Sequence, residues 1–224
     1  AVTSANRPVT GTGAAAAVLD ISGGPIFDFG TAPIGSNTDI PFTVQNNGGV
    51  AATSVADGLG LAAPFSFRGG GGYPGVGGTC GGTINAGASC TIVVRYTPAV
   101  VGTLSDSIAI TYNNGVVGGN SSTRLIQGSG ANPANLEFDY APTFDYEILL
   151  TGLFRNNTFT VTNNGGVTAT GMSGTGLAAP YTFASGAYPG GGTCGATLNS
   201  GATCTVIVRY TPVTSIPHND TVQI

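Results

Sequence analysis

The sequence predicts an all-β protein made of two tandem β-sandwiches, each with an internal disulfide. Two observations carry this prediction. The chain of 224 residues repeats itself once, and each repeat consists of short runs in which apolar and polar residues alternate between glycine-rich turns. Such alternation is typical of half-buried strands, whereas no stretch has the spacing of a long amphipathic helix. Because each repeat is long enough for its own core, we expect two domains rather than one.

The repeat is clearest at Cys80–Pro98, which recurs as Cys194–Pro212. Nearer the N-terminus, Phe42–Val50 matches Phe159–Val167 at a distance of 117 residues, and this distance shrinks to 114 at the cysteines. The shrinkage requires three single-residue deletions in a glycine-rich segment, which we interpret as surface loops. We expect an N-terminal strand followed by two sandwiches, at residues 1–14, 15–131 and 132–224.

Eight alternating runs in the first repeat are the expected strands. They span residues 18–21, 27–29, 39–45, 52–56, 65–67, 90–96, 107–112 and 123–127. Seven or eight short strands between Asn-Gly and Gly-Gly turns are the pattern of an immunoglobulin-type sandwich. In the run 90–96, alternation predicts that Val93 faces away from the core. The expected core side chains are Leu19, Phe29, Phe42, Val44, Ile92, Val94, Tyr96, Ile108 and Ile110, with their equivalents in the second repeat.

The four cysteines form two equivalent pairs, Cys80 with Cys90 and Cys194 with Cys204. A turn sequence, Asn-Ala-Gly or Asn-Ser-Gly, lies inside each pair and brings its members close enough to bridge. A disulfide that closes so short a loop stabilises a fold by about 2 to 3 kcal/mol. A zinc site is the alternative, but zinc ligand pairs usually have only a few residues between them, whereas nine intervene here. Disulfides indicate an oxidising compartment, so we expect an extracellular protein.

Several short motifs of the first repeat are similar to those of a known family. They are Phe27–Gly35, Phe42–Asn46, Ala86–Ile92 and Tyr96–Thr103. The chain resembles the choice-of-anchor D group of bacterial immunoglobulin-like domains over both repeats. This resemblance implies tandem domains in a secreted or surface-attached bacterial protein, with a structural or adhesive role. The second repeat departs from the family pattern at Glu147–Gly152, so the conformation of this link is not predicted by the resemblance.

The composition argues against several functions. Only 7% of the residues are charged, the net charge is -4, and the arginines are spread along the chain, so we expect no nucleic-acid partner. No apolar run is long enough to predict a membrane span. His218 is the only histidine, and we interpret it as a solvated turn residue because the sequence shows no cluster of a nucleophile with an orienting carboxylate, or of metal ligands, around it. We therefore expect neither enzymatic activity nor a cofactor or metal.

The two ends of the chain are out of phase with the repeat. The last residues align with 107–110, so we expect the second domain to lack its final strand and to expose an acceptor edge, formed by Thr221, Val222, Gln223 and Ile224. The segment that matches the final strand, Arg124–Ala131, stands at the front of the chain, 117 residues earlier. An edge without its neighbour invites an incoming strand. The expected polymerisation strand consists of Arg7, Pro8, Val9, Thr10, Gly11, Thr12 and Gly13.

These observations favour a structural subunit of a surface filament, in which copies of the chain join head to tail by strand donation. One alternative is that the chain is a fragment of a longer array, in which the missing strand lies beyond Ile224. Another is an adhesin or carbohydrate-binding stalk, with a host or surface glycan stacked on the aromatic loops near Tyr73 and Tyr188. The opposing interpretation of these loops is that Phe65, Phe67, Tyr181 and Phe183 form strands that cap the core.

Overall fold

A computed structural model describes residues 3–140 and 142–224. This part of the chain consists of strands, turns and irregular segments, and it contains no helix long and apolar enough to cross a membrane. The contacts divide the chain into two compact units, Ala1–Ser129 and Gly130–Ile224, which we call unit 1 and unit 2. The division falls two residues before the expected domain boundary.

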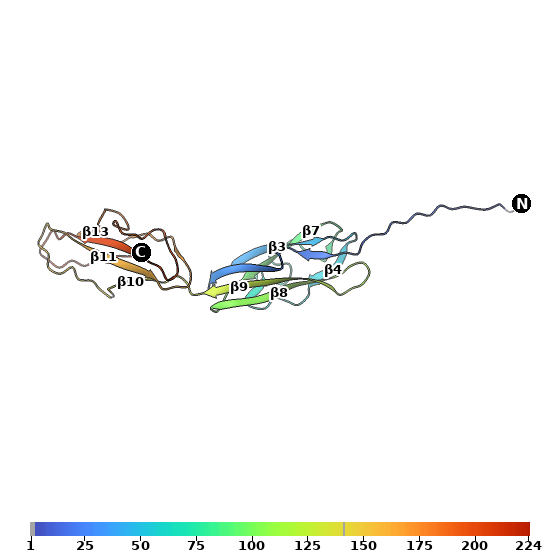
Figure 1. The fold of residues 1–224 in the computed structure, drawn as a ribbon, viewed down its shortest axis with the longest axis horizontal. Helices are drawn as coiled ribbons and strands as arrows, with labels where there is room; N and C mark the ends of the chain where they lie inside the picture. Colours follow the sequence, from blue (N-terminus) through green and yellow to red (C-terminus); the bar gives the residue numbers. More distant parts are fainter. Residues whose placement is uncertain (1–2, 141) are drawn as a thin grey trace. The chain divides into compact units, whose positions relative to one another are not determined.

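Unit 1 is built from nine strands in two sheets. One sheet has the order β1-β3-β7-β5 and the other the order β2-β9-β8-β4-β6. The strand β9 therefore lies in the interior of the larger sheet, between β2 and β8 (Figure 1). The strands are β1 (Leu19–Ile21), β2 (Ile26–Pro33), β3 (Thr38–Asn46), β4 (Ala52–Asp57), β5 (Phe65–Phe67), β6 (Thr83–Ile84), β7 (Ser89–Tyr96), β8 (Gly102–Asn113) and β9 (Asn120–Ala131).

Both sheets of unit 1 contribute to one core. Phe42, Val44, Ile92 and Tyr96 come from the smaller sheet, and all are at most 1% exposed. The larger sheet supplies equally buried side chains, among them Ile108, Ile110 and Ile126. The eight predicted strands are confirmed, and the expected core residues of unit 1 are buried except Phe29, which is half-buried. Of their equivalents in unit 2, Leu136, Val222 and Ile224 are only half-buried.

The prediction about Val93 in the strand β7 is confirmed, because Val93 does not belong to the core cluster that contains Ile92, Val94 and Tyr96. The side chain is nevertheless only 7% exposed, which the alternation did not predict. The loop after β5 covers it, because the Arg68 amide donates to the Val93 carbonyl at 2.9 Å and the Val93 amide donates to Pro74 at 2.9 Å. A tertiary contact of this kind leaves no trace in the alternation of the strand.

Unit 2 repeats the smaller sheet but not the larger one. Its main sheet has the order β10-β11-β15-β13, with the register Leu136↔Asn163 where unit 1 has Leu19↔Asn46. A short pair, β12 with β14, and a single bridge between Thr175 and Gln223 stand where unit 1 has strands of its larger sheet. The strands are β10 (Leu136–Phe138), β11 (Arg155–Asn163), β12 (Ala169–Thr170), β13 (Tyr181–Phe183), β14 (Thr197–Leu198) and β15 (Thr203–Tyr210).

Each unit is held at one end by a fully buried asparagine, Asn46 or Asn163. The Asn46 amide group donates to the carbonyls of Val50 and Ile84, at 2.8 and 3.0 Å, and its side-chain oxygen accepts from two backbone amides. Asn163 makes the same four bonds in unit 2. A buried amide with all its partners satisfied fixes the loops that it bridges.

The predicted disulfides are present. Cys80 is bonded to Cys90 and Cys194 to Cys204, each over a separation of 10 residues. In both units the second cysteine lies on a strand of the smaller sheet, and the amide of the first donates to a residue on the same strand. The disulfide thus ties the glycine-rich loop to the strand that follows it.

Candidate functional site

Unit 2 carries an open groove with a volume of about 990 Å³. One wall is formed by residues 136–147, as far as the structure describes them, and the other by residues 217–222. The floor consists of core side chains, including Phe159, Tyr181 and Tyr210. All residues that line the groove belong to unit 2, so the groove is a property of this unit alone.

The aromatic floor repeats an arrangement found in unit 1. There, Tyr96 stacks on Phe65 with ring centres 5.0 Å apart, and Phe29 lies 5.6 Å from Tyr96. In unit 2, Tyr210 stacks on Tyr181 at 4.8 Å, and Tyr146 lies 5.4 Å from Tyr210. The core under the groove is therefore organised as in a unit that has its complete larger sheet.

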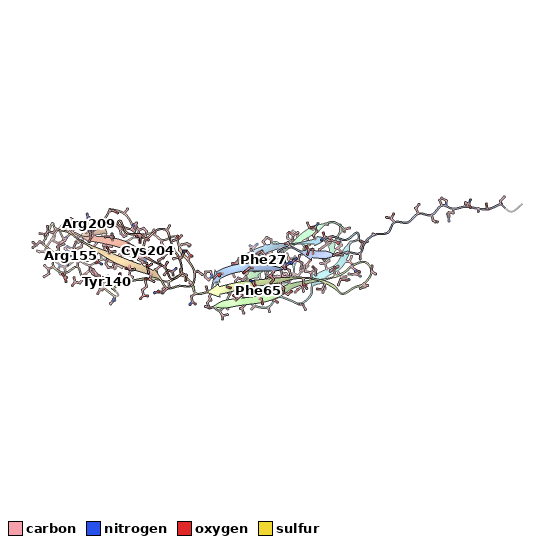
Figure 2. The ribbon with its side chains drawn as sticks, in the orientation of Figure 1. Phe27, Phe65, Tyr140, Arg155, Cys204 and Arg209 are labelled. Carbon is pink, nitrogen blue, oxygen red and sulfur yellow. A yellow bond between two sulfur atoms is a disulfide. The ribbon has the colours of Figure 1, made fainter. Side chains whose placement is uncertain are left out.

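The part of the first wall from residue 143 onward aligns with β2 of unit 1, but residues 143–150 form no strand. Its aromatic side chains nevertheless occupy their expected places: Phe144 packs edge-on against Phe159 at 5.3 Å, and the Tyr146 hydroxyl donates to the Val208 carbonyl at 2.9 Å. Burial raises the pKa of Tyr146 well above its ordinary value. Tyr140, labelled in Figure 2, packs against Phe144 at the rim and is 57% exposed.

The link that departs from the family pattern begins in this wall. Glu147 has φ 59°, at the position where unit 1 has Gly30 with φ 76°. A left-handed conformation is unfavourable for a residue with a side chain. Further on, the amide of Gly152 donates to Pro212 at 2.9 Å, as Gly35 donates to Pro98 at 2.8 Å. The segment Glu147–Gly152 thus begins without the strand that the aligned part of β2 forms, but its last glycine makes the same hydrogen bond as Gly35.

The second wall is held against the floor by tyrosine hydroxyls. Tyr181 donates to the His218 carbonyl at 3.0 Å, and the Tyr210 hydroxyl lies 3.1 Å from His218 Nδ1. His218 Nε2 lies 2.9 Å from the Thr214 hydroxyl. The interpretation of His218 as a solvated turn residue is therefore wrong, because the ring is half-buried and both of its nitrogens have partners.

In unit 1, the place of the groove is filled by β9. Ile126 of this strand is fully buried, and Gly128 lies directly over the ring of Tyr96. Arg124 donates from Nε to the Ile21 carbonyl at 2.8 Å, and its Nη2 lies 3.4 Å from Asp20 Oδ1. At the outer face, Gln127 Nε2 donates to Asp28 Oδ2 at 2.9 Å, which lowers the pKa of Asp28. The groove of unit 2 is the space that a strand of this kind occupies in unit 1.

The rim of the groove is acidic. Five of the lining residues carry carboxylates, and none of the lining residues, all within the described part of the chain, is an arginine or lysine. Arg155, which does not line the groove, reaches Glu147 at 3.1 Å. Such a rim favours a cationic group on whatever enters. The carboxylates belong to Glu137, Asp139, Asp145, Glu147 and Asp220.

The expected polymerisation strand has no partner within the described chain. Residues 3–15 form no strand (Figure 1). They are exposed, and Val9 is 89% exposed. Of the expected acceptor edge, Thr221 and Val222 line the groove, Gln223 makes the bridge to Thr175, and Ile224 packs against the core. Sequence reasoning missed the opposite wall, residues 143–147, although its alignment with residues 26–30 was a usable signal.

The aromatic loops do not form an exposed platform. Phe65 and Phe67 are buried in β5, and the rings of Tyr73 and Tyr188 pack edge-on against Phe67 and Phe183. The interpretation that these aromatics form strands and cap the core is confirmed. Among the described residues there is no cluster of three or more side chains suited to hold a metal ion.

Comparisons with known proteins identify the fold of unit 1. Residues 21–129 match the family model of the HYDIN/CFA65/VesB-like Ig-like domain. No curated protein matches the chain. The match ends two residues before β9 does, and it spans strands of both sheets of unit 1.

Solved structures give only distant likenesses. A protein of unknown function from Porphyromonas gingivalis W83 is 11% identical, over 87% of this chain and 83% of that one, with a TM-score of 0.39. The VesB protease of Vibrio cholerae is 19% identical over 50% of this chain and 31% of its own, with a TM-score of 0.35. A PapD-like domain of human CEP192 is 13% identical over 59% and 96%, with a TM-score of 0.33. Identities and TM-scores this low support no conclusion about function. The family match shows that residues 21–129 of this chain form an immunoglobulin-like domain.

Proposed function

We propose that this chain is a structural subunit of an extracellular filament, made of two tandem immunoglobulin-like sandwiches of the choice-of-anchor D type. Subunits join head to tail when Arg7–Gly13 of one copy enters the groove of unit 2 in the next. One observation carries this proposal. The groove occupies the place that β9 fills in unit 1, and the segment that aligns with β9 is exposed and unpaired.

The physical basis is the cost of an incomplete sheet. In unit 1 the residues on both sides of β9 form long strands, whereas in unit 2 the aligned segment 143–150 forms no strand and the aligned segment 218–224 has a single bridge, from Gln223 to Thr175. An inserted strand supplies backbone partners to both segments, and each hydrogen bond contributes about 1 kcal/mol. Burying Val9 adds about 1.5 to 3 kcal/mol. The contact is heterologous and does not close on itself, so it generates a filament.

The two disulfides support an oxidising location outside the cell. We place the filament at a bacterial surface, by the resemblance of both repeats to surface-attached domains. The role is non-enzymatic. The aromatics on which the expectation of a glycan partner was based are packed into the core. A glycan is therefore not part of this proposal.

The proposal is tested by comparing the full chain with two variants: one lacks residues 1–13, and the other is full-length with Val9→Asp. We expect the wild-type chain to form filaments in electron micrographs and concentration-dependent oligomers in size-exclusion chromatography. Both variants should be monomeric, because a buried unpaired carboxylate is too costly to insert. Thr10→Ala, on the outer face of the strand, is the matched control and should assemble like the wild type.

A wild-type chain that stays monomeric at all concentrations would refute strand donation between copies. The groove would then be completed by residues outside this segment of the array, as in a longer tandem-repeat stalk. Assembly that persists in both variants would show a contact elsewhere on the chain and would also overturn the proposal.

A further inference from the structure

We infer that the groove of unit 2 recognises its strand by four alternate positions, with the pattern Arg-x-apolar-x-Gly-x-Gly. In this chain the pattern stands at Arg7, Val9, Gly11 and Gly13. It also stands inside unit 1, in β9, at Arg124, Ile126, Gly128 and Gly130. This inference rests on the proposed function and states what the donated strand must contain. The contacts of β9 in unit 1 give the reason for each position.

The arginine position is defined by the contacts of Arg124. Its guanidinium, whose side chain is 15% exposed, binds the Ile21 carbonyl and Asp20 at the end of β1. The register of β10 on β11 equals that of β1 on β3, so Phe138 and Glu137 stand where Ile21 and Asp20 stand in unit 1. A donated Arg7 would thus meet a carbonyl and a carboxylate, which favours a bidentate cation.

The charges of the two partners are complementary. Five carboxylates surround the groove. Arg7 is the only charged residue between residues 3 and 15. A lysine would satisfy the charge but not the forked geometry, so we expect arginine to be preferred.

The apolar position faces the floor of the groove. Ile126 has no exposed surface in unit 1, and its neighbours in the strand, Leu125 and Gln127, are exposed or half-buried. Val9 holds the same place in the alternation and is smaller by one methylene. A polar side chain here would be buried without a partner, which makes the position selective.

The glycine position faces a tyrosine ring. A Cβ atom on Gly128 would lie 2.7 Å from Cζ of Tyr96, a ring that is fully buried and cannot move aside. In unit 2, Tyr210 is the equivalent of Tyr96, and it stacks on Tyr181, which is the equivalent of Phe65. Even alanine at residue 11 should therefore clash with the ring. Gly130 is buried as well, which extends the requirement for a small residue to Gly13.

The positions between these four tolerate change. Leu125 is 52% exposed, and its equivalent is Pro8, which lacks an amide hydrogen and so forgoes one bond of the ladder. Gln127 and Ser129 are half-buried, with side chains on the outer face, and their equivalents are Thr10 and Thr12. These substitutions show that the outer face does not carry the pattern.

The test uses the full-length Val9→Asp chain as acceptor, since its own strand is excluded while its groove is unchanged. Labelled peptides of residues 3–14 are added, and binding is measured by fluorescence anisotropy. The wild-type peptide should bind, and R7A, V9S and G11A should each weaken binding by about tenfold or more. R7K should fall between R7A and the wild type. The T10A peptide, changed only on the outer face, should stay within about threefold.

A charge exchange identifies the acceptor of Arg7. Glu137→Arg in the acceptor should weaken the wild-type peptide and restore part of the binding of an R7E peptide. If R7A and G11A bind as well as the wild type, the recognition pattern is wrong although strand donation stands. If the wild-type peptide does not bind at all, strand donation itself fails, and the two outcomes are distinct.

Discussion

Unit 1 and unit 2 share their cysteine loops, their buried asparagines and their aromatic centre, but differ in the larger sheet. Unit 1 completes this sheet with β9. In unit 2 the segment that aligns with β2 forms no strand, although its aromatic side chains pack as in unit 1. The difference teaches that side-chain packing places this wall of the groove, while the strand itself requires a backbone partner.

The largest expected difference concerns the two equivalent apolar residues, Ile126 and Val9. Ile126→Ala should lower the free energy of unfolding of unit 1 by about 2 to 5 kcal/mol, because it leaves a cavity in the core. Val9→Ala should leave both units unchanged in dilute solution, since Val9 is 89% exposed. Hydrogen–deuterium exchange, followed peptide by peptide, separates the two units in the intact chain.

The matched control is Leu125→Ala, which changes a neighbouring side chain that is 52% exposed. It should have a small effect on exchange in unit 1. Equal effects of the Ile126 and Leu125 substitutions would contradict the assignment of β9 as the strand that closes the core.

A smaller effect is expected at the strained position of the first wall. Glu147→Gly should stabilise unit 2 by about 0.5 to 1 kcal/mol, because glycine accepts the left-handed conformation that Gly30 has in unit 1. Thermal unfolding of the full chain checks this gain. Gly30→Glu, the reverse exchange in unit 1, should be destabilising, and a stabilising result there would contradict the explanation.

The smallest effect concerns a surface ion pair that only unit 1 has. Arg95 binds Asp39 through two bonds of 2.7 and 2.8 Å, and Arg68 adds a third contact at 3.0 Å. In unit 2 the equivalent Arg209 bonds an amide instead, Asn156. The hydrogen bonds from Arg95 lower the pKa of Asp39, so the pair stabilises unit 1 above the pKa of an unfolded aspartate.

This contribution should be lost as the pH falls below about 4. Asp39→Asn would then slightly destabilise unit 1 at neutral pH and remove part of its acid sensitivity. Unfolding curves between pH 3 and 7 measure the difference. An Asp39→Asn chain with unchanged acid sensitivity would show that the pair contributes nothing.

The sequence was sufficient for eight strands of unit 1 and for the disulfides, because alternation and spacing are local signals. It could not predict β6, whose two residues are too short to show a period, nor the burial of Val93 under a neighbouring loop. The alignment of residues 221–224 with residues 107–110 of β8 pointed to the wall of the groove that residues 217–222 form. The other wall required the strand order β2-β9-β8, which is a non-local property of the sheet.

The side chains at the groove show the same limit. The place of His218 against Tyr210 depends on the path of residues 213–220, which no motif specifies. By contrast, the alignment of Arg7–Gly13 with β9 was visible at once, because identical spacing of arginine and glycine is a sequence property.

The most direct test of strand donation is a crosslink between two different chains, one with Thr10→Cys and the other with Asp145→Cys. These residues are the equivalents of Gln127 and Asp28, whose side chains are in contact between β9 and β2. All four native cysteines are in disulfides, so the new thiols have no competitors. Mixed under mild oxidation, the two chains should form a covalent dimer. Thr10→Cys with Asp28→Cys should form none, because β9 already occupies that site in unit 1; no dimer with Asp145→Cys, or equal dimers with both, would contradict strand donation.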